Sequence, residues 1–429
     1  MNDKKDGKTK IVLFMGNVRE GEYEWFYKNN IKLGIILDKN NAKKVGDLSR
    51  FELIEHFDFK NDIGDLFDII ATIEENYTIV CLLNMREFYV KPTAMVAEKY
   101  GFQGISIKAA ENSLSKNRMR TLFKKNMGDS AIVHHALISN AMDLEAFINK
   151  VGLPIVVKPS NLYGSMFVDL VRDKGEAASC YFQTINKINE YHKRAPISVN
   201  EIPLQAEEFL QGSVHSIDCL VDKEGHVYTT PIVDVFTARD MGIDDFHHYA
   251  RVTPSLLSGP DQEAAKKIAM DGVIALDIKS SLAHVEFVLT PSGPKLLEIG
   301  ARVGGNRAHM LNKAYGIDLV PAYAKMLQGA NYQQELKPKR QSAFAFLTPY
   351  STQEGVFEQF NQLERVLRLP TYFGHRAAIQ SGDRVGLAKN GHIYFLTIEL
   401  LASKVNSILL DIKRIHEIND LFTIIRDKS

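Results

Sequence analysis

The chain has 429 residues, of which 45% are hydrophobic and 24% charged. This composition is typical of a globular protein with two to four domains and excludes a disordered tail or a mini-protein. Lysine plus arginine equals aspartate plus glutamate at 52 each. No excess of positive charge therefore favours nucleic acid or an anionic membrane as a partner.

Two further features indicate a cytoplasmic protein. Cys81, Cys180 and Cys219 lie far apart without a CxxC pair, which speaks against a disulfide framework or a cysteine-rich zinc site. The N-terminal MNDKKDGKTK is polar, and the apolar run behind it is much shorter than the roughly 20 residues of a membrane span. We expect contact with neither a membrane nor nucleic acid.

The first part of the chain alternates short β-rich runs with helical stretches up to YTIVCLLN at 77–84. This alternation predicts a parallel sheet with helices packed on it. The first strand is followed by MGNVREGE and not by GxGxxG, so we expect any nucleotide to bind elsewhere.

From about residue 109 the pattern changes to α+β, with a basic helix at 111–126 and the strand PIVVKPS at 154–160. Antiparallel strands follow, with a turn at KEG. Residues 237–250 lack a period and carry charge and histidine, which predicts an exposed loop near a site. The remaining expectations are a strand RVTPSLL, a helix at 261–275, a hairpin at 283–302, an amphipathic helix at 306–328 and a small β-rich C-terminal domain.

The hairpin segment SLAHVEFVLTPSGPKLLEIGARVGGNR holds the strongest chemical signal. Glu286 and Glu298 are equidistant from Ser292 at the tip, so they should face each other with Cβ atoms about 4.5 to 5.5 Å apart. Two opposed carboxylates should repel unless something positive lies between them, and magnesium fits because its remaining positions accept water and phosphate oxygens. Arg302, four residues after Glu298, should project from the same face towards a negative group at the metal.

The alternative is that both glutamates lie on a solvated face of the hairpin. Glycines at 300, 304 and 305 favour the site, because glycines in such a segment cost stability unless the backbone must approach something closely.

Other candidate residues are ambiguous one by one. Lys158, in a strand of valines, either reaches the surface or directs its ammonium at an anion, and the small residues after it, Gly164 and Ser165 among them, offer groups for phosphate. Lys116 lies in a basic helix of the kind that is usually a solvated face. Glu207 in QAEEFL suits either an adenine edge or the surface.

The order of these features resembles the ATP-grasp superfamily of carboxylate-amine ligases from about residue 10 to 425. The chain is most similar to the L-amino-acid ligases, which join unprotected amino acids into dipeptides, and its layout is also similar to that of biotin carboxylase. The resemblance implies an α/β (α+β overall) fold in four parts: an N-terminal α/β domain at 1–108, an ATP-grasp small subdomain with a mobile lid at 109–205, a catalytic subdomain at 206–335 and a β-rich C-terminal domain at 336–429.

The resemblance also implies roles for individual residues. Lys116 and Lys158 would contact ATP phosphates under a flap near 160–168, and Glu207 with the backbone of Phe209 and Leu210 would bind adenine. Glu286 and Glu298 would hold magnesium, and Arg302 would stabilise an acyl phosphate and the intermediate formed after amine attack. The cofactors would be ATP and Mg²⁺ or Mn²⁺, the partners small amino-acid substrates, and the assembly a homodimer as in many relatives.

The chain departs from the family pattern at four positions. Leu162 and Phe167 replace flap glycines, Val214 replaces a glutamate that reads the ribose in many relatives, and Gly300 replaces an asparagine often used as a third metal ligand.

The resemblance also implies a substrate-binding region in the segment DMGIDDFHHYARVTPS. Asp244, Asp245, His247 and His248 lie where relatives contact substrate, and the acids there would favour a cationic amino acid; an exposed polar loop is the alternative. Gly304, Gly305 and His309 are further candidates. Two competing functions remain: another ATP-grasp ligase acting on a non-proteinogenic acid or amine, and a non-catalytic nucleotide-binding protein.

Overall fold

A computed structural model describes residues 4–5, 7–40, 46–128, 133–162, 166–194, 203–390, 396–418 and 421–425. The described residues contain both helices and strands, and the strands form four sheets. This confirms the mixed α/β class. Within these residues no helix is long and apolar enough to cross a membrane.

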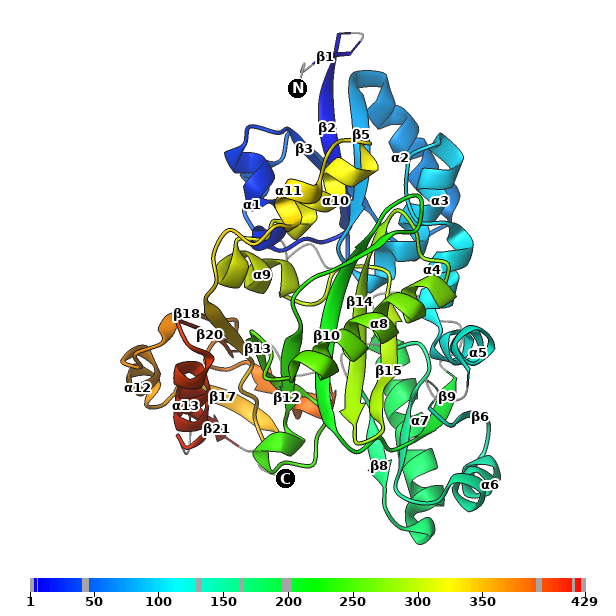
Figure 1. Ribbon diagram of the computed structural model, residues 1–429, viewed down its shortest axis with the longest axis vertical. Helices are drawn as coiled ribbons and strands as arrows, with labels where there is room; N and C mark the ends of the chain where they lie inside the picture. The colour runs from blue at the N-terminus through cyan, green and yellow to red at the C-terminus, as the bar shows by residue number, and fades with distance from the viewer. Residues whose placement is uncertain are drawn as a thin grey trace.

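The N-terminal part is the parallel sheet that the sequence predicts (Figure 1). Strands β2 (Lys8–Met15), β3 (Leu33–Asp38), β4 (Leu53–Phe57) and β5 (Tyr77–Asn84) run parallel, and the short β1 (Lys4–Lys5) pairs antiparallel with β2. Helices α1 (Glu20–Lys28), α2 (Ile63–Asn76) and α3 (Val90–Tyr100) accompany it. The central strands are apolar on both faces because helices cover both.

Two short helices link this sheet to the next part of the chain, α4 (Ile107–Leu114) and α5 (Lys116–Met127). The prediction of one basic helix at 111–126 is therefore wrong. Ser115 interrupts it with an extended backbone, and its Oγ accepts a hydrogen bond from the N–H of Arg118 at 3.3 Å. Serine is a preferred N-cap because its hydroxyl satisfies an unpaired amide of the first turn. The break makes Lys116 the first residue of α5.

A four-stranded antiparallel sheet with two helices forms what we call the lid subdomain, at the lower right of Figure 1. Its strand order is β6 (His135–Ile138), β9 (Leu204–Glu208), β7 (Ile155–Pro159) and β8 (Asp169–Val171), and its helices are α6 (Ala141–Val151) and α7 (Ala177–Arg194). Strands β7 and β9 are mostly buried, and they carry Lys158 and Glu207.

The largest sheet has nine strands and forms the body of the molecule. Its order is β15 (Gly293–Gly300), β14 (Ser281–Thr290), β10 (Ser213–Val221), β12 (Val233–Thr237), β13 (His248–Thr253), β16 (Ala343–Leu347), β20 (Leu396–Ala402) and β18 (Tyr372–Ala377), with β11 (Val227–Thr229) beside β10. Helix α8 (Gly259–Ala275) packs on β14 and β15.

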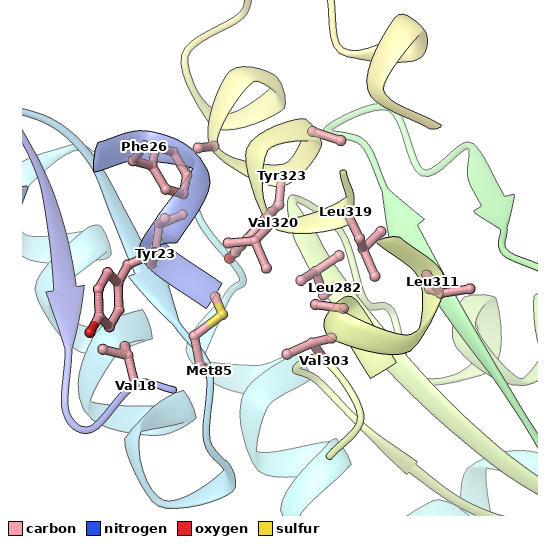
Figure 2. Close-up of a cluster of buried hydrophobic side chains, with 14 of the residues drawn as sticks. Val18, Tyr23, Phe26, Met85, Leu282, Val303, Leu311, Leu319, Val320 and Tyr323 are labelled. Carbon is pink, nitrogen blue, oxygen red and sulfur yellow. The ribbon is translucent and has the colours of Figure 1, made fainter. Parts of the chain in front are cut away.

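After the hairpin come two helices where the sequence predicts one at 306–328. Helix α9 (Arg307–Tyr315) ends at Gly316, whose φ is 70°, and α10 (Leu319–Leu327) begins three residues later. A left-handed glycine is the usual helix terminator. The turn lets α10 pack against α1, so that side chains from both helices and from the loops beside them share one buried cluster, including Phe26, Met85 and Val320 (Figure 2).

In the C-terminal part, β16, β20 and β18 extend the nine-stranded sheet. Among the described residues of this part, β17 (Gly355–Phe360), β19 (Arg384–Val385) and β21 (Phe422–Ile425) form a separate three-stranded sheet. Helices α11 (Gln333–Leu336), α12 (Leu363–Leu367) and α13 (Val405–His416) complete the fold. The four-part division stays a proposal, and its limits after 108 and 205 fall inside α4 and β9.

Candidate active site

A cleft with an empty volume of about 1360 Å³ lies between the lid subdomain and the β10, β14 and β15 strands. Nine of the predicted residues line it: Lys116, Lys158, Glu207, Phe209, Leu210, His248, Glu286, Glu298 and Arg302. Residues that are far apart in the sequence therefore lie around the same cleft.

Glu286 and Glu298 are cross-strand partners in β14 and β15, as the symmetric hairpin predicts. The geometry of the hairpin differs from the prediction of a symmetric turn centred on Ser292. The turn has two residues, Pro291 and Ser292, and a bulge in β15 restores the pairing of Glu286 with Glu298. Without the bulge Glu286 would oppose Leu297. Bulges re-aim side chains beside functional sites, and this one brings the second carboxylate opposite the first.

Each of these two carboxylates contacts a neighbouring basic side chain, and about a quarter of each glutamate side chain remains exposed. His284 Nε2 lies 3.2 Å from Glu286 Oε1, and Lys116 Nζ lies 3.2 Å from Glu298 Oε2. Burial alone would raise the pKa of Glu286, but the hydrogen bond with His284 outweighs it and lowers that pKa. Glu286 therefore stays ionised at neutral pH, as a ligand of a hard divalent cation must.

Arg302 lies just beyond the end of β15 and is held by Glu87, which follows β5 of the N-terminal sheet. Its Nε donates to Glu87 Oε2 at 2.8 Å and its Nη1 to the carbonyl of Val303 at 3.1 Å. Burial raises the pKa of Glu87, and the charge of Arg302 opposes this. The guanidinium is positioned at the cleft by a residue more than 200 positions away.

Lys158 and Glu207 meet inside the lid subdomain, with Nζ and Oε2 2.5 Å apart. The other oxygen of Glu207 accepts from Arg120 Nε at 2.9 Å and from Gln205 Nε2 at 2.7 Å. Burial would raise the pKa of Glu207, but Arg120 and Lys158 lower it. Glu207 is thus a buried, ionised group, not the surface residue of the alternative interpretation.

The lid edge of the cleft is described only in part. Lys116 Nζ donates to the carbonyl of Leu162 at 2.6 Å, so this flap position touches a predicted phosphate-binding lysine. Phe167 is buried in the lid core, with a φ of 57°. Gly164 and Ser165 lie outside the described residues.

Residues 237–250 are not the exposed loop that the sequence predicts, because Asp245 and His247 are buried and β13 begins at His248. Asp244 is exposed but forms a bidentate ion pair with Arg172 of the lid subdomain at 2.9 and 2.8 Å, and a contact with Arg239. Neither acid is among the cleft residues. The hypothesis that they select a cationic amino acid gains no support here.

His248 is the substrate candidate that does line the cleft. Burial lowers its pKa to about 4, so it is neutral at pH 7 and can accept or donate a hydrogen bond.

The remaining candidates, Gly304, Gly305 and His309, are not among the residues that line the cleft. The N–H of Gly304 donates to the buried Asp218 at 2.7 Å, and a Cβ at this position would lie 2.4 Å from His284. Gly305 is half-buried. His309 bonds Glu399 of β20 at 3.1 Å, which is the packed and hydrogen-bonded role usual for a helical histidine.

Four residues that support the site were missed: Glu87, Arg120, Asp218 and His284. Nothing in the sequence around Glu87 or Asp218 indicates their role, because their partners Arg302 and His284 come from distant segments. His284 precedes Glu286 by two and so shares its strand face, a signal that was available. Arg120 follows Lys116 by four on one helix face, which was available too.

Comparison with known proteins agrees with this arrangement. Residues 151–309 match the family described as ATP-grasp domain. The chain contains an ATP-grasp domain. It is also 28% identical over 309 residues to alanine--anticapsin ligase of Bacillus subtilis (strain 168), which covers 67% of this chain and 62% of that relative. The match therefore spans less than two thirds of the relative's length.

Solved structures confirm the ATP-grasp fold over nearly the whole chain. L-amino acid ligase from Bacillus licheniformis superposes with a TM-score of 0.79 at 19% identity, covering 98% of this chain and 100% of that one. N5-carboxyaminoimidazole synthetase from Staphylococcus aureus, solved with ADP, gives a TM-score of 0.71 at 12% identity, covering 97% and 99%. The chain is thus related to ATP-grasp ligases in its domain and its fold.

Proposed function

We propose that this protein is an ATP-dependent, ADP-forming ligase that joins two L-amino acids into a dipeptide. One observation carries the proposal: two lysines, two opposed glutamates and an arginine meet around one cleft of an ATP-grasp fold. The similarity to alanine--anticapsin ligase supports amino acids as the substrate class.

The nucleotide would lie between the lid subdomain and β14–β15. Lys116 and Lys158 are nearly buried cations whose present partners are Glu298 and Glu207. Incoming phosphates would give Lys116 a second anionic partner, and charge-assisted contacts of this kind are the strong ones. The carboxylate of Glu207 and the backbone of Phe209 and Leu210 would receive the adenine edge.

Glu286 and Glu298 fit a magnesium or manganese ion, since both are carboxylate side chains, lie opposite each other and line the cleft. When bound, the ion would neutralise phosphate charge and align the transferred group. Gly300 supplies no third ligand, so the two glutamates are the protein ligands that this proposal assigns.

The reaction would run in two steps. A carboxylate oxygen of the first amino acid attacks the γ-phosphorus, the bond to ADP breaks, and an acyl phosphate forms. The amine of the second amino acid then attacks the acyl carbon, and phosphate leaves. Arg302 would meet the negative charge in both steps; its described hydrogen bonds use Nε and Nη1, which leaves Nη2 available.

The test is release of ADP and phosphate from ATP and magnesium across all pairs of the twenty amino acids, with mass spectrometry of the products. Release that needs an amino acid and yields a condensed mass supports the proposal and names both substrates. Silence across the panel contradicts it and favours a non-proteinogenic acid or amine, or nucleotide binding without catalysis. Cytoplasmic location and a homodimer belong to the same proposal, and gel filtration checks the second.

A further inference from the structure

Asp240 is an acidic side chain on the cleft wall for which the proposed reaction has no use. The described cleft residues include five acids. Glu207, Glu286 and Glu298 have proposed roles, and Glu208 is paired with Lys295 at 3.3 Å. Asp240 is exposed to the cleft and forms no ion pair among the described residues.

The position of Asp240 along the cleft follows from its neighbours. Asp240 lies in the short 3-10 helix η6 (Arg239–Met241), directly after β12. Val214 of β10 pairs with Val235 of β12, and Thr237, two residues further along, also lines the cleft. Asp240 therefore lies close to the part of the cleft that Val214 lines.

The same helix is tied to the adenine end of the cleft. The Arg239 guanidinium lies over the rings of Phe209 and Phe246, 5.4 and 5.2 Å from their centroids. Phe209 follows β9 and carries the backbone proposed to face adenine. The phosphate end is fixed by Lys116 and Glu298, so a ribose has to lie between these two ends, along the Val214 wall.

A ribose in this stretch needs acceptors for its two hydroxyls, since burying a donor without a partner costs about 1 to 3 kcal/mol. Val214 and Val288 offer none. Asp240 offers a preorganised carboxylate: its Oδ2 accepts from the N–H of Thr237 at 2.6 Å and from its hydroxyl at 2.7 Å. These two bonds fix the side chain, and the described contacts leave Oδ1 to the cleft.

We propose that Asp240 reads the ribose hydroxyls of the nucleotide and replaces the carboxylate that position 214 lacks. The inference rests on the proposed nucleotide site. It makes Asp240 a binding and specificity residue and gives it no part in the transfer chemistry.

The test compares binding of ATP and 2′,3′-dideoxy-ATP to the full-length chain by calorimetry, without amino acids. The wild type should bind ATP about tenfold more tightly, the equivalent of one good hydrogen bond to a charged group. Asp240→Ala should lose that factor for ATP, bind dideoxy-ATP as before and so abolish the preference. The double variant Asp240→Ala, Val214→Glu should restore it, and the control Glu208→Ala should keep it.

Two results would overturn the inference while leaving the nucleotide site in place. Equal weakening of both nucleotides by Asp240→Ala would show that the residue only supports the fold of η6. A preference for ATP that survives in Asp240→Ala would show that another group reads the ribose. A wild type that binds neither nucleotide would overturn the proposed function and this inference together.

Discussion

The carboxylate of Glu87 occupies the space into which a side chain at position 300 would project. A Cβ added to Gly300 would lie 2.8 Å from Glu87 Oε2 and 3.5 Å from Arg302 Cζ. The ion pair between Glu87 and Arg302, 2.8 Å long, therefore requires the glycine. Gly300, which departs from the family pattern, is therefore the residue that leaves room for Glu87 to hold Arg302.

This relationship predicts that Gly300→Ala destabilises the protein by about 1 to 3 kcal/mol, the usual cost of overpacking a buried contact. Glu87→Ala removes the atoms in conflict, so the double variant should lose less than the sum of the two single variants. Urea unfolding of all four proteins measures this coupling. Gly259→Ala, with no atom within 4 Å of its added Cβ, is the matched control; strictly additive effects at 87 and 300 would contradict the argument.

Removing one of the paired glutamates should weaken metal binding. Glu298→Gln keeps the shape of the side chain but removes its charge, and a divalent ion bound to two carboxylates then loses one anionic ligand. We expect Mn²⁺ affinity in the presence of ADP to fall at least about tenfold, measured by electron paramagnetic resonance. Glu358→Gln, on an exposed position of β17, should bind as the wild type does.

We expect Arg120 to contribute more to the free energy of unfolding than an arginine on an exposed helix face does. It is 1% exposed and also donates to the carbonyls of Leu296 and Leu297. Arg120→Met leaves Glu207 with one cation fewer in a buried site, which costs about 3 kcal/mol or more. Equilibrium unfolding in urea checks this, with Arg118→Met as control because the pair of Arg118 with Glu111 is exposed. An equal effect of both variants would argue against the buried pair.

The lowered pKa of Glu207 predicts a specific acid sensitivity. A carboxyl group whose folded-state pKa is lowered stabilises the protein above the unfolded pKa of about 4.3 and loses this contribution as pH falls towards the folded pKa. The free energy of unfolding should therefore drop below about pH 4.3. Arg120→Met raises the folded pKa, so its profile from pH 6 to pH 3 should be flatter than that of the wild type. Parallel profiles would show that Glu207 does not contribute.

We expect Asp244 to influence how the lid subdomain is held against the rest of the protein, and not which amino acid the protein binds. Its pairing with Arg172 joins the lid subdomain to the body, and both side chains are about half exposed, so Asp244→Asn should change the unfolding free energy by less than about 1 kcal/mol. Dissociation of a fluorescent ADP analogue should be faster in the variant at low salt and equal to the wild type at high salt. Asp271→Asn, which breaks an exposed pair within α8, is the control; a changed substrate preference would contradict this assignment.

Periodicity and turn residues predicted the local elements well. The parallel sheet and the pairing of Glu286 with Glu298 follow from patterns that a few neighbouring residues set. The two helix breaks, at Ser115 and Gly316, were not predicted, although serine and glycine are ordinary helix-end residues.

Contacts between distant segments escaped sequence reasoning. Nothing near Glu87 indicates that it will meet Arg302, and Asp244 looks like a free acid until Arg172 is placed beside it. In both cases tertiary structure supplies the opposite charge. Isolated acids in a sequence are therefore poor guides to substrate charge.

The continuity of the largest sheet limits where this protein can be truncated or joined to a relative in a chimaera. Strand β13 pairs with β16 across nearly a hundred residues of sequence. A fragment that ends at residue 335 would keep every proposed catalytic residue but expose the β13 edge, and an uncovered edge strand invites association between chains. Chimaeras that graft a relative's C-terminal region would need to carry β16, β18 and β20 as one block and preserve their register with β13.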